Sequence, residues 1–392
     1  MARQKRIPKF FDLTIRIVSA GLLLAILVHR SGDVRSSVIQ RDSIAYWATG
    51  RLIVHGENPY DVNAVAMLEK EQGYSGYPLV LRTPPWSLFM VLPLGLFTPY
   101  SASLLWLVVL IAALVGSVHM CMRILSVPSA SRSAFQVIAY TFAPVLACLY
   151  LGQMGLLMLF GFVVFLRFHS ERPFLAGAAL LLPLAKPHVS SIFWIAFILW
   201  VIPKNRRAIA VGCLSALIAA TVIGIAVDLT AFRDYSSALE SQSIGRLFIP
   251  ALSGVLRLLF FRSAFWVQFV PMLLGLVWFS QFWAVNRSRW NWCDHGLTTL
   301  VVSILVTPYA WMSDEVILLP AMMQAAAFFY KRDFVSRWTT WLVVGMFFSL
   351  NALLLGLLIA KVPFATGVYF WSSLVWFGWY VYGRRQLRWS AA

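Results

Sequence analysis

A polar segment near the start of the chain carries a carboxylate that could act on a lipid headgroup. The segment QRDSIAYWATGRLIVHGENPYD, residues 40–61, holds three acids and two arginines, and it follows a largely apolar run at residues 13–28. Its apolar side chains recur at roughly helical spacing around a central Tyr-Trp pair. We therefore expect an amphipathic helix on the outer membrane surface that ends at Gly56. Such a helix would hold Asp42 at the level of the headgroups. The alternative is that Asp42 only caps the helix N-terminus.

Further along the chain, charged residues occur within apolar runs, where a charge is costly enough to indicate function. Lys186 follows the apolar stretch at residues 175–185. It either binds a ligand or extends from the helix end to the membrane surface. Asp314 and Glu315 form an acid pair in the late apolar region, and we expect Glu315 to be exposed at a helix start.

Other kinds of catalytic chemistry have no support in the sequence. The cysteines are scattered in or beside apolar runs, and the histidines have no metal-ligand spacing (His29, His55, His119, His169, His188 and His295). The chain has no P-loop, no GxGxxG motif and no GxSxG motif, which leaves nucleotide-driven and serine-based chemistry without a site. We therefore expect neither a metal nor an organic cofactor.

The elements that must position these residues are membrane helices. Sixty per cent of the residues are hydrophobic and 12% are charged, with a mean hydropathy of +0.77, whereas soluble domains have ~25% charged residues. Apolar runs near 20 residues match a bilayer core, which admits only helices or closed barrels, and no strand-like alternation suggests a barrel. The sequence predicts an all-α polytopic membrane protein, with residues 1–392 forming one integral module.

Thirteen candidate spans follow from these runs, and the charge pattern favours about twelve. The runs are residues 13–28, 84–97, 102–121, 135–150, 155–168, 173–186, 189–203, 208–227, 264–285, 296–308, 315–330, 338–360 and 364–382. An odd number of spans would put the termini on opposite sides of the membrane, whereas the basic clusters place both on one side. We expect one of the short runs at 84–97, 155–168 and 173–186 to be re-entrant or a half-helix.

The net charge of +17 reflects membrane topology, because basic residues cluster at the ends of apolar runs. Such clusters are ARQKR at the start, KNRR at 204–207, NRSR at 286–289 and RRQLR at 384–388. The positive-inside rule assigns these ends to the cytoplasm. We therefore expect a cell-membrane protein with both termini cytoplasmic and no nucleic-acid partner. Two long loops, residues 29–83 and 228–263, would then be extracytoplasmic.

Between residues 40 and 330 the chain resembles glycosyltransferase family 87 in four motifs. These are the acid–AYW–GENPYD segment with the YP…RTPPWSLFMVLPLGLF that follows it, YLGQMGLLML at 150–159, LAGAALLLPLAKPHVSSIF at 175–193 and TPYAWMSDEVILLPAM at 307–322. The family is of the GT-C type, and its members use polyprenyl-phosphate-linked sugars, many of them mannose. The resemblance implies a GT-C-type bundle of about twelve transmembrane helices with interfacial helices in the first outer loop. It also implies an active site at the extracytoplasmic face and no dependence on a metal.

The resemblance implies a role for the carboxylate in the opening segment. Asp42 would be the general base that takes the proton of the acceptor hydroxyl, because the departing phosphate already carries its own charge. The donor phosphate would be bound by Arg82, Lys186 and His188.

Sugar and acceptor contacts follow from the same motifs. Gln153 would bind a sugar or bridge helices. By the resemblance Asp314 aligns with the family's acid, where some members carry His instead. It would either orient the acceptor or pair with Lys186. The remaining expected contacts to sugar or acceptor are Tyr46, His55 and Tyr60.

These expectations define a membrane glycosyltransferase. It would move a sugar, with mannose favoured, from a polyprenyl-phosphate donor to a glycolipid or polysaccharide acceptor, and its other partners would be membrane lipids. A multi-pass transporter or a flippase for lipid-linked sugars is the alternative, although the two halves of the chain lack the similar hydropathy expected of a transporter. A non-catalytic partner of a polysaccharide-assembling machine is the third possibility.

Overall fold

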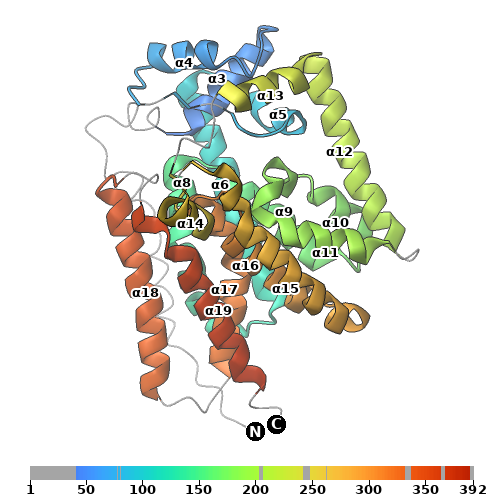
Figure 1. Ribbon diagram of the computed structural model, residues 1–392, viewed down its shortest axis with the longest axis vertical. Coiled ribbons are helices and arrows are strands. Elements are labelled where there is room, and N and C mark those ends of the chain that lie inside the picture. The colour runs from blue at the N-terminus through green and yellow to red at the C-terminus, as the bar shows by residue number, and fades with distance from the viewer. Residues whose placement is uncertain are drawn as a thin grey trace.

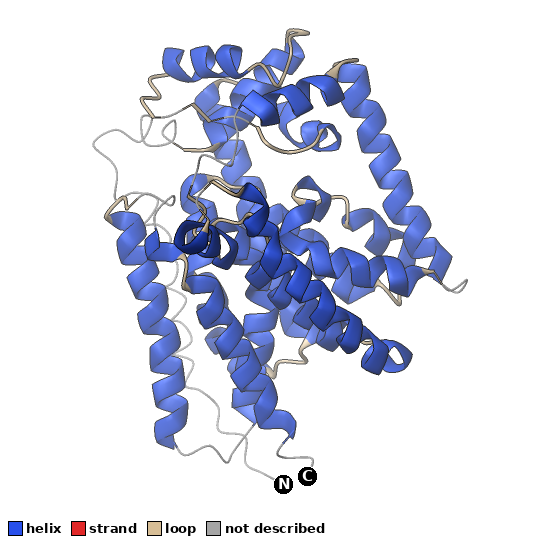
Figure 2. Cartoon of the chain, viewed as in Figure 1, coloured by secondary structure: helices blue, strands red, loops and turns tan. Residues whose placement is uncertain are grey.

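The structure is an arrangement of helices. The computed structural model describes residues 41–388 except 77, 80, 203–205, 242–247, 262, 332–336 and 363–366. All regular elements within these residues are helical, with loops between them (Figure 2). The predicted all-α class is therefore confirmed, whereas the predicted first span at residues 13–28 lies outside the described residues.

The helices form a layer at one end of the molecule and longer elements that extend away from it (Figure 1). The first third of the chain forms α3 (Ser43–Val54), α4 (Val62–Glu71), α5 (Leu88–Val91), α6 (Pro99–Ile124), α7 (Arg132–Tyr140), α8 (Ala143–Leu151) and α9 (Gly155–Phe168). The middle forms α10 (Pro173–Ala179), α11 (Ser191–Val201), α12 (Arg207–Val227), α13 (Ala231–Ser241) and α14 (Leu252–Phe260). The last third forms α15 (Val270–Asn286), α16 (Leu297–Val306), α17 (Leu319–Lys331), α18 (Arg337–Ile359) and α19 (Ser372–Arg388). The layer contains α3, α4, α5 and α13, and α18 and α19 lie toward the opposite end (Figure 1).

Four helical stretches in the described part have the length and composition of membrane spans. They are Pro99–Ile124, Arg207–Val227, Phe265–Arg289 and Met312–Phe329, and two bent helix pairs raise the number to as many as six. The expected number of about twelve is not confirmed, because several predicted runs form broken or shorter helices. Ser129–Tyr140 and Ala143–Leu151 meet at 55°, and Pro173–Ala185 and Pro187–Val201 meet at 117°. The sharper bend is consistent with the expectation of a re-entrant or half-helix at residues 173–186.

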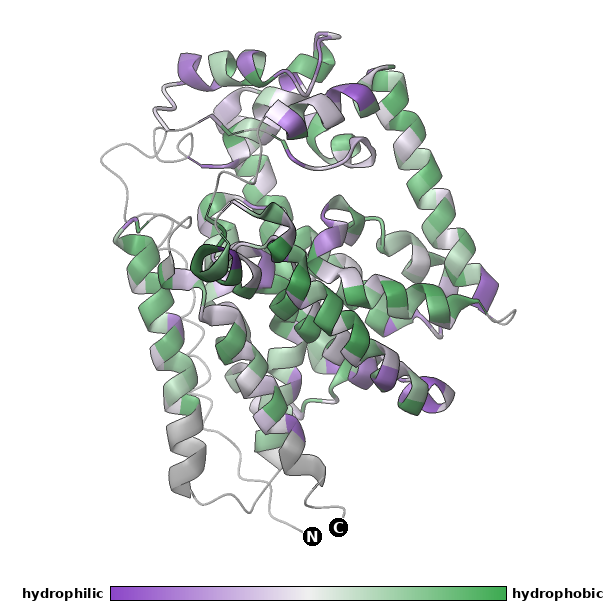
Figure 3. Ribbon diagram, in the orientation of Figure 1, coloured by the Kyte–Doolittle hydropathy of each residue, from purple (hydrophilic) through white to green (hydrophobic). Residues whose placement is uncertain are grey.

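Polar and apolar residues are separated along the molecule in the way that a membrane protein requires. Helices α12 and α15 are apolar along most of their length, whereas polar residues gather on α4 and α13 and near the far end of α15 (Figure 3). In the layer, α13 of the second loop predicted as extracytoplasmic packs against the first loop and the turn that follows it. The rings of Tyr60 and Tyr235 are tilted by 57° with centroids 5.4 Å apart, and the rings of Trp86 and Phe232 have centroids 6.3 Å apart.

Helix α3 is buried, which differs from the amphipathic surface helix that its sequence predicts. Ten of its twelve residues are buried. One side packs so closely on the 3₁₀ turn Leu92–Leu96 that a Cβ on Gly50 would lie 2.8 Å from the Gly95 backbone nitrogen. The Trp47 indole N–H donates to the Phe97 carbonyl at 3.0 Å, and the residue is buried. The helix ends as predicted, with Gly56 at φ +72° directly after it. The protein therefore fixes the position of α3 on all sides.

Candidate functional site

A proline-bounded break places Lys186 inside the protein. Pro183 begins the 3₁₀ turn η4 (Pro183–Ala185) and Pro187 begins η5 (Pro187–Ser190), with Lys186 between them at φ −138° and ψ 69°. Neither proline has a backbone N–H to continue a helix, so the chain turns sharply at this point. The side chain of Lys186 consequently leaves the bend without following either helix to the membrane surface.

Lys186 is held by an ion pair with Asp314. The Lys186 Nζ lies 2.7 Å from the Asp314 Oδ1, and the two side chains are 14% and 1% exposed. The other carboxylate oxygen of Asp314 accepts a hydrogen bond from the Trp311 N–H at 3.0 Å, at the start of the turn η11 (Met312–Leu318). The alternative in which Lys186 extends to the surface is therefore wrong, and of the two roles considered for Asp314 the structure contains the pairing.

Gln153 joins this ion pair to α3. Gly152 ends α8 in the left-handed conformation at φ +74°, and its carbonyl accepts a 2.7 Å hydrogen bond from the Trp106 indole. The chain thereby places the Gln153 amide beside the N-terminus of α3. The amide oxygen accepts from the Tyr46 hydroxyl at 3.2 Å and from the Lys186 Nζ at 3.5 Å.

Asp42 is the end of this chain of contacts. Its side chain makes no capping hydrogen bond to α3 and instead accepts one from the Gln153 Nε2. Burial raises the pKa of Asp42 above its ordinary value, while the Gln153 hydrogen bond and the Lys186 ammonium oppose this rise. Asp61 provides the contrast, because its carboxylate caps α4 by accepting from two backbone N–H groups at 2.9 and 3.1 Å. The interpretation of Asp42 as a helix cap is therefore wrong.

His188 and Tyr309 extend the polar wall beyond Lys186. Their rings meet edge to face at a centroid distance of 5.6 Å. The His188 Nε2 is buried and has no hydrogen-bond partner in the part of the chain that the structure describes. Asp42, Gln153 and Lys186 are, like these two rings, only partly buried. Side chains that are polar, convergent and partly exposed are what a ligand site requires.

Three of the expected site residues lie outside this cluster. His55 is exposed just after the end of α3, about 20 Å along the helix axis from Asp42 at 1.5 Å per residue. Tyr60 is buried and donates to the Thr83 carbonyl at 2.9 Å. Arg82 precedes that threonine, is partly exposed and makes no hydrogen bond or ion pair with the residues that the structure describes. The structure thus unites Asp42 with the later motifs but not with these three.

Two further carboxylates are buried, and one of them, Glu315, differs from its expected exposure. Glu315, expected at an exposed helix start, is 4% exposed and accepts hydrogen bonds from Ser372 Oγ at 2.6 Å and Trp376 Nε1 at 2.9 Å, which tie η11 to α19. Glu69, on α4, was not among the expected site residues. It is 1% exposed, and one of its oxygens accepts from the Leu79 N–H at 3.1 Å. Burial raises the pKa of Glu69 to about 7, and nearby Asp42 adds to the effect.

The cluster can perform two chemical tasks at once. The carboxylate of Asp42, with its raised pKa, can take a proton, and the ammonium of Lys186, which contacts the same Gln153 amide, can bind an anion. The described residues contain no group of three or more His, Cys, Asp or Glu side chains arranged to hold a metal ion.

Comparison with known proteins assigns most of this cluster to one family. The family model of glycosyltransferase family 87 matches residues 83–329, which include Gln153, Lys186 and Asp314. Asp42 lies upstream of the matched region. Comparison with curated proteins and with solved structures finds no match for the chain.

Proposed function

Because the chain belongs to glycosyltransferase family 87, we propose that it transfers a sugar from a polyprenyl-phosphate donor, with Asp42 as the general base. The observation that carries this proposal is the line of contacts from Asp42 through Gln153 to the Lys186–Asp314 ion pair. The Gln153 amide contacts the Asp42 carboxylate through its nitrogen and the Lys186 ammonium through its oxygen, although the three residues are far apart in the chain.

The reaction divides between these two groups. The acceptor hydroxyl loses its proton to Asp42 as its oxygen forms a bond to the anomeric carbon of the donor sugar. The bond between that carbon and the phosphate oxygen breaks, and its electron pair leaves with the polyprenyl phosphate. Lys186 binds the phosphate, and its charge is maintained by Asp314 at 2.7 Å. A single base suffices, because the phosphate departs as an anion without a proton.

The remaining polar groups support binding. We propose that the unpaired Nε2 of His188 hydrogen-bonds the phosphate or the sugar, since a buried polar nitrogen without a partner is costly unless a ligand satisfies it. Arg82, partly exposed and without an ion pair in the described part of the chain, is proposed to contact the donor phosphate after the donor binds. Tyr46 orients the Gln153 amide through its hydroxyl.

We place the reaction at the extracytoplasmic face. The helices around Asp42 belong to the layer that contains α4 and α13, whereas Arg287, Arg289 and Arg384 lie at the far ends of α15 and α19 (Figures 1 and 3). The positive-inside rule assigns the arginine-rich ends to the cytoplasm. Mannose as the sugar, and a glycolipid or a polysaccharide as the acceptor, are part of the same proposal.

The test is donor dependence. Purified protein in native-lipid vesicles is incubated with polyprenyl-phospho-[¹⁴C]mannose, and the label is followed into lipid and glycan fractions. We expect label to leave the donor and appear in a product only when the protein is present. The vesicles must contain folded protein and the acceptors of the native membrane. If the donor then stays intact, the proposal is refuted. Movement of the intact donor across the membrane would instead identify a flippase.

A further inference from the structure

A polar pocket lies away from the α3 layer, where α15 and α19 end (Figure 1). Its volume is about 880 Å³, and its walls come from the end of α15, the following turn, α17 and α19. Asn286, Arg289, Asp294, Gln324 and Arg384 are among the lining residues. None of them belongs to the cluster around Asp42.

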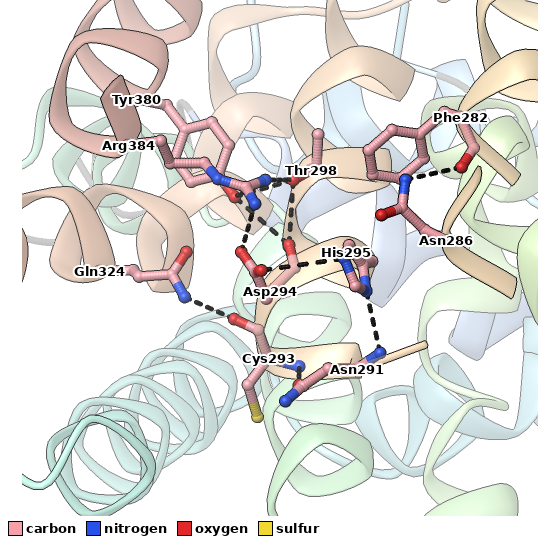
Figure 4. A network of polar contacts seen from close by, with 10 residues as sticks. All are labelled: Phe282, Asn286, Asn291, Cys293, Asp294, His295, Thr298, Gln324, Tyr380 and Arg384. Atoms are coloured by element: carbon pink, nitrogen blue, oxygen red, sulfur yellow. Dashed lines mark hydrogen bonds and ion pairs between the residues drawn. The ribbon is translucent and has the colours of Figure 1, made fainter. Parts of the chain in front are cut away.

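One wall of the pocket holds a fixed guanidinium. The Arg384 side chain forms an ion pair with the Asp294 carboxylate at 2.6 Å and also donates to Thr298, while its side chain remains 25% exposed. Asp294 stands on the π-turn Trp292–Gly296, which presents its side chain to α19 (Figure 4). These contacts fix one cation at the edge of the pocket.

A second cation is available for a ligand. Arg289 is exposed, lines the pocket and has no ion pair or hydrogen bond among the residues described. Arg289 and Arg384 together exceed the charge of Asp294 by one positive unit. The pocket is therefore complementary to an anion.

An unsatisfied acceptor lies in the same wall. The Gln324 Nε2 donates to the Cys293 carbonyl at 2.5 Å, whereas its Oε1 is buried without a partner among the described residues (Figure 4). The residue is 6% exposed. A buried carbonyl oxygen is normally hydrogen-bonded, so this one needs a donor from a ligand, such as a hydroxyl.

An apolar groove continues from the pocket along the helices. It has a volume of about 470 Å³ and shares Trp278 and Arg384 with the polar pocket. Leu274, Leu305 and Phe377 line it between α15, α16 and α19. A soluble anion would fill only the pocket, whereas a lipid would fill both parts.

We propose that the pocket and groove bind one anionic phospholipid whose headgroup carries hydroxyl groups, of the phosphatidylglycerol type. Its phosphate contacts Arg289 and Arg384, a headgroup hydroxyl donates to the Gln324 Oε1, and an acyl chain lies in the groove. The bound lipid joins α15 to α19. This site is independent of the sugar-transfer reaction proposed above.

Binding is measured by native mass spectrometry of the full chain in detergent, titrated with phosphatidylglycerol, phosphatidic acid and phosphatidylcholine. We expect phosphatidylglycerol to bind about tenfold or more tightly than phosphatidylcholine, because the choline cation weakens the attraction of the arginines for the headgroup and offers no hydroxyl to the Gln324 Oε1. Phosphatidic acid, which has the phosphate but no headgroup hydroxyl, should fall between the two. Phosphatidylglycerol should also raise the thermal midpoint, and the rise should follow the logarithm of its free concentration once this exceeds Kd.

Two variants separate the parts of the site. Arg289→Gln changes an exposed side chain and should reduce phosphatidylglycerol binding to the level of phosphatidylcholine. Gln324→Leu should reduce it to the level of phosphatidic acid. Arg123→Gln, the same substitution at an exposed residue near the end of α6, should bind as the wild type does. Equal binding of the three lipids, unchanged binding by Arg289→Gln, or full competition by soluble glycerol phosphate would overturn the proposal.

Discussion

Replacing both partners of the Lys186–Asp314 ion pair should restore part of the stability that each single replacement loses. It should not restore catalysis. Asp314 is 1% exposed and Lys186 is 14% exposed, and removing one partner of a buried pair costs about 3–5 kcal/mol, because the other charge stays buried and unpaired. Lys186→Met and Asp314→Asn should each be destabilised by this order. The double variant contains neither charge, so it should be more stable than the sum of the single effects by about 0.5–3 kcal/mol.

Catalysis should not recover with stability. The double variant still lacks the cation proposed to bind the donor phosphate, so its donor use should remain about ten- to hundredfold below the wild type. Thermal midpoints in detergent at a fixed scan rate report the first effect, and donor kcat/KM reports the second. If the double variant regains wild-type donor use, or if its destabilisation equals the sum of the single effects, the pair does not act as described.

Three further predictions test neighbouring residues. Glu69→Gln should raise the thermal midpoint at pH 8 but not at pH 5. Burial raises the pKa of Glu69 from 4.5 in the unfolded chain to about 7 in the folded protein. The protonated carboxyl therefore contributes to stability, and this contribution is lost as the pH rises through the folded-state pKa. An equal shift of the thermal midpoint at both pH values would contradict this. Gly152→Ala should lower stability by about 1–2 kcal/mol, because φ is +74° and the new Cβ would lie 3.0 Å from the Cβ of Ser43, and a midpoint equal to that of the wild type would count against it. Arg82→Ala should raise the donor KM more than the acceptor KM, and unchanged values of both would remove Arg82 from the site.

Local features of the sequence predicted the helical class and the position of some helices. The run at 155–168 coincides with α9, and the prediction that Lys186 has a function rested on the cost of a charge in an apolar run. The partners of that charge could not be predicted in this way, because Asp314 is 128 residues away and the bend at Pro187 sets the direction of the side chain. Helix periodicity likewise could not reveal that both sides of α3 are covered.

The errors have physical reasons. His55 was placed near the site, although a straight helix of twelve residues carries it away from Asp42. Glu315 was expected to be exposed, because its sequence neighbours do not include α19, whose Ser372 and Trp376 bury it. The expected number of spans is not confirmed in the described part of the chain. The runs at 173–186 and 189–203, which hydropathy reads as two spans, form one pair of helices bent by 117° beside Pro187.

The most direct measurement is the transfer rate of Asp42→Asn with the polyprenyl-phosphate donor. The asparagine oxygen can still accept the hydrogen bond from Gln153, so the fold and its thermal midpoint should be retained, but the side chain can no longer take a proton. We predict a rate about 10²–10⁴ lower than that of the wild type. Asp61→Asn, which changes a carboxylate that caps α4, should keep most of its activity. Transfer by Asp42→Asn at a rate near that of the wild type would contradict the assignment of Asp42 as the general base.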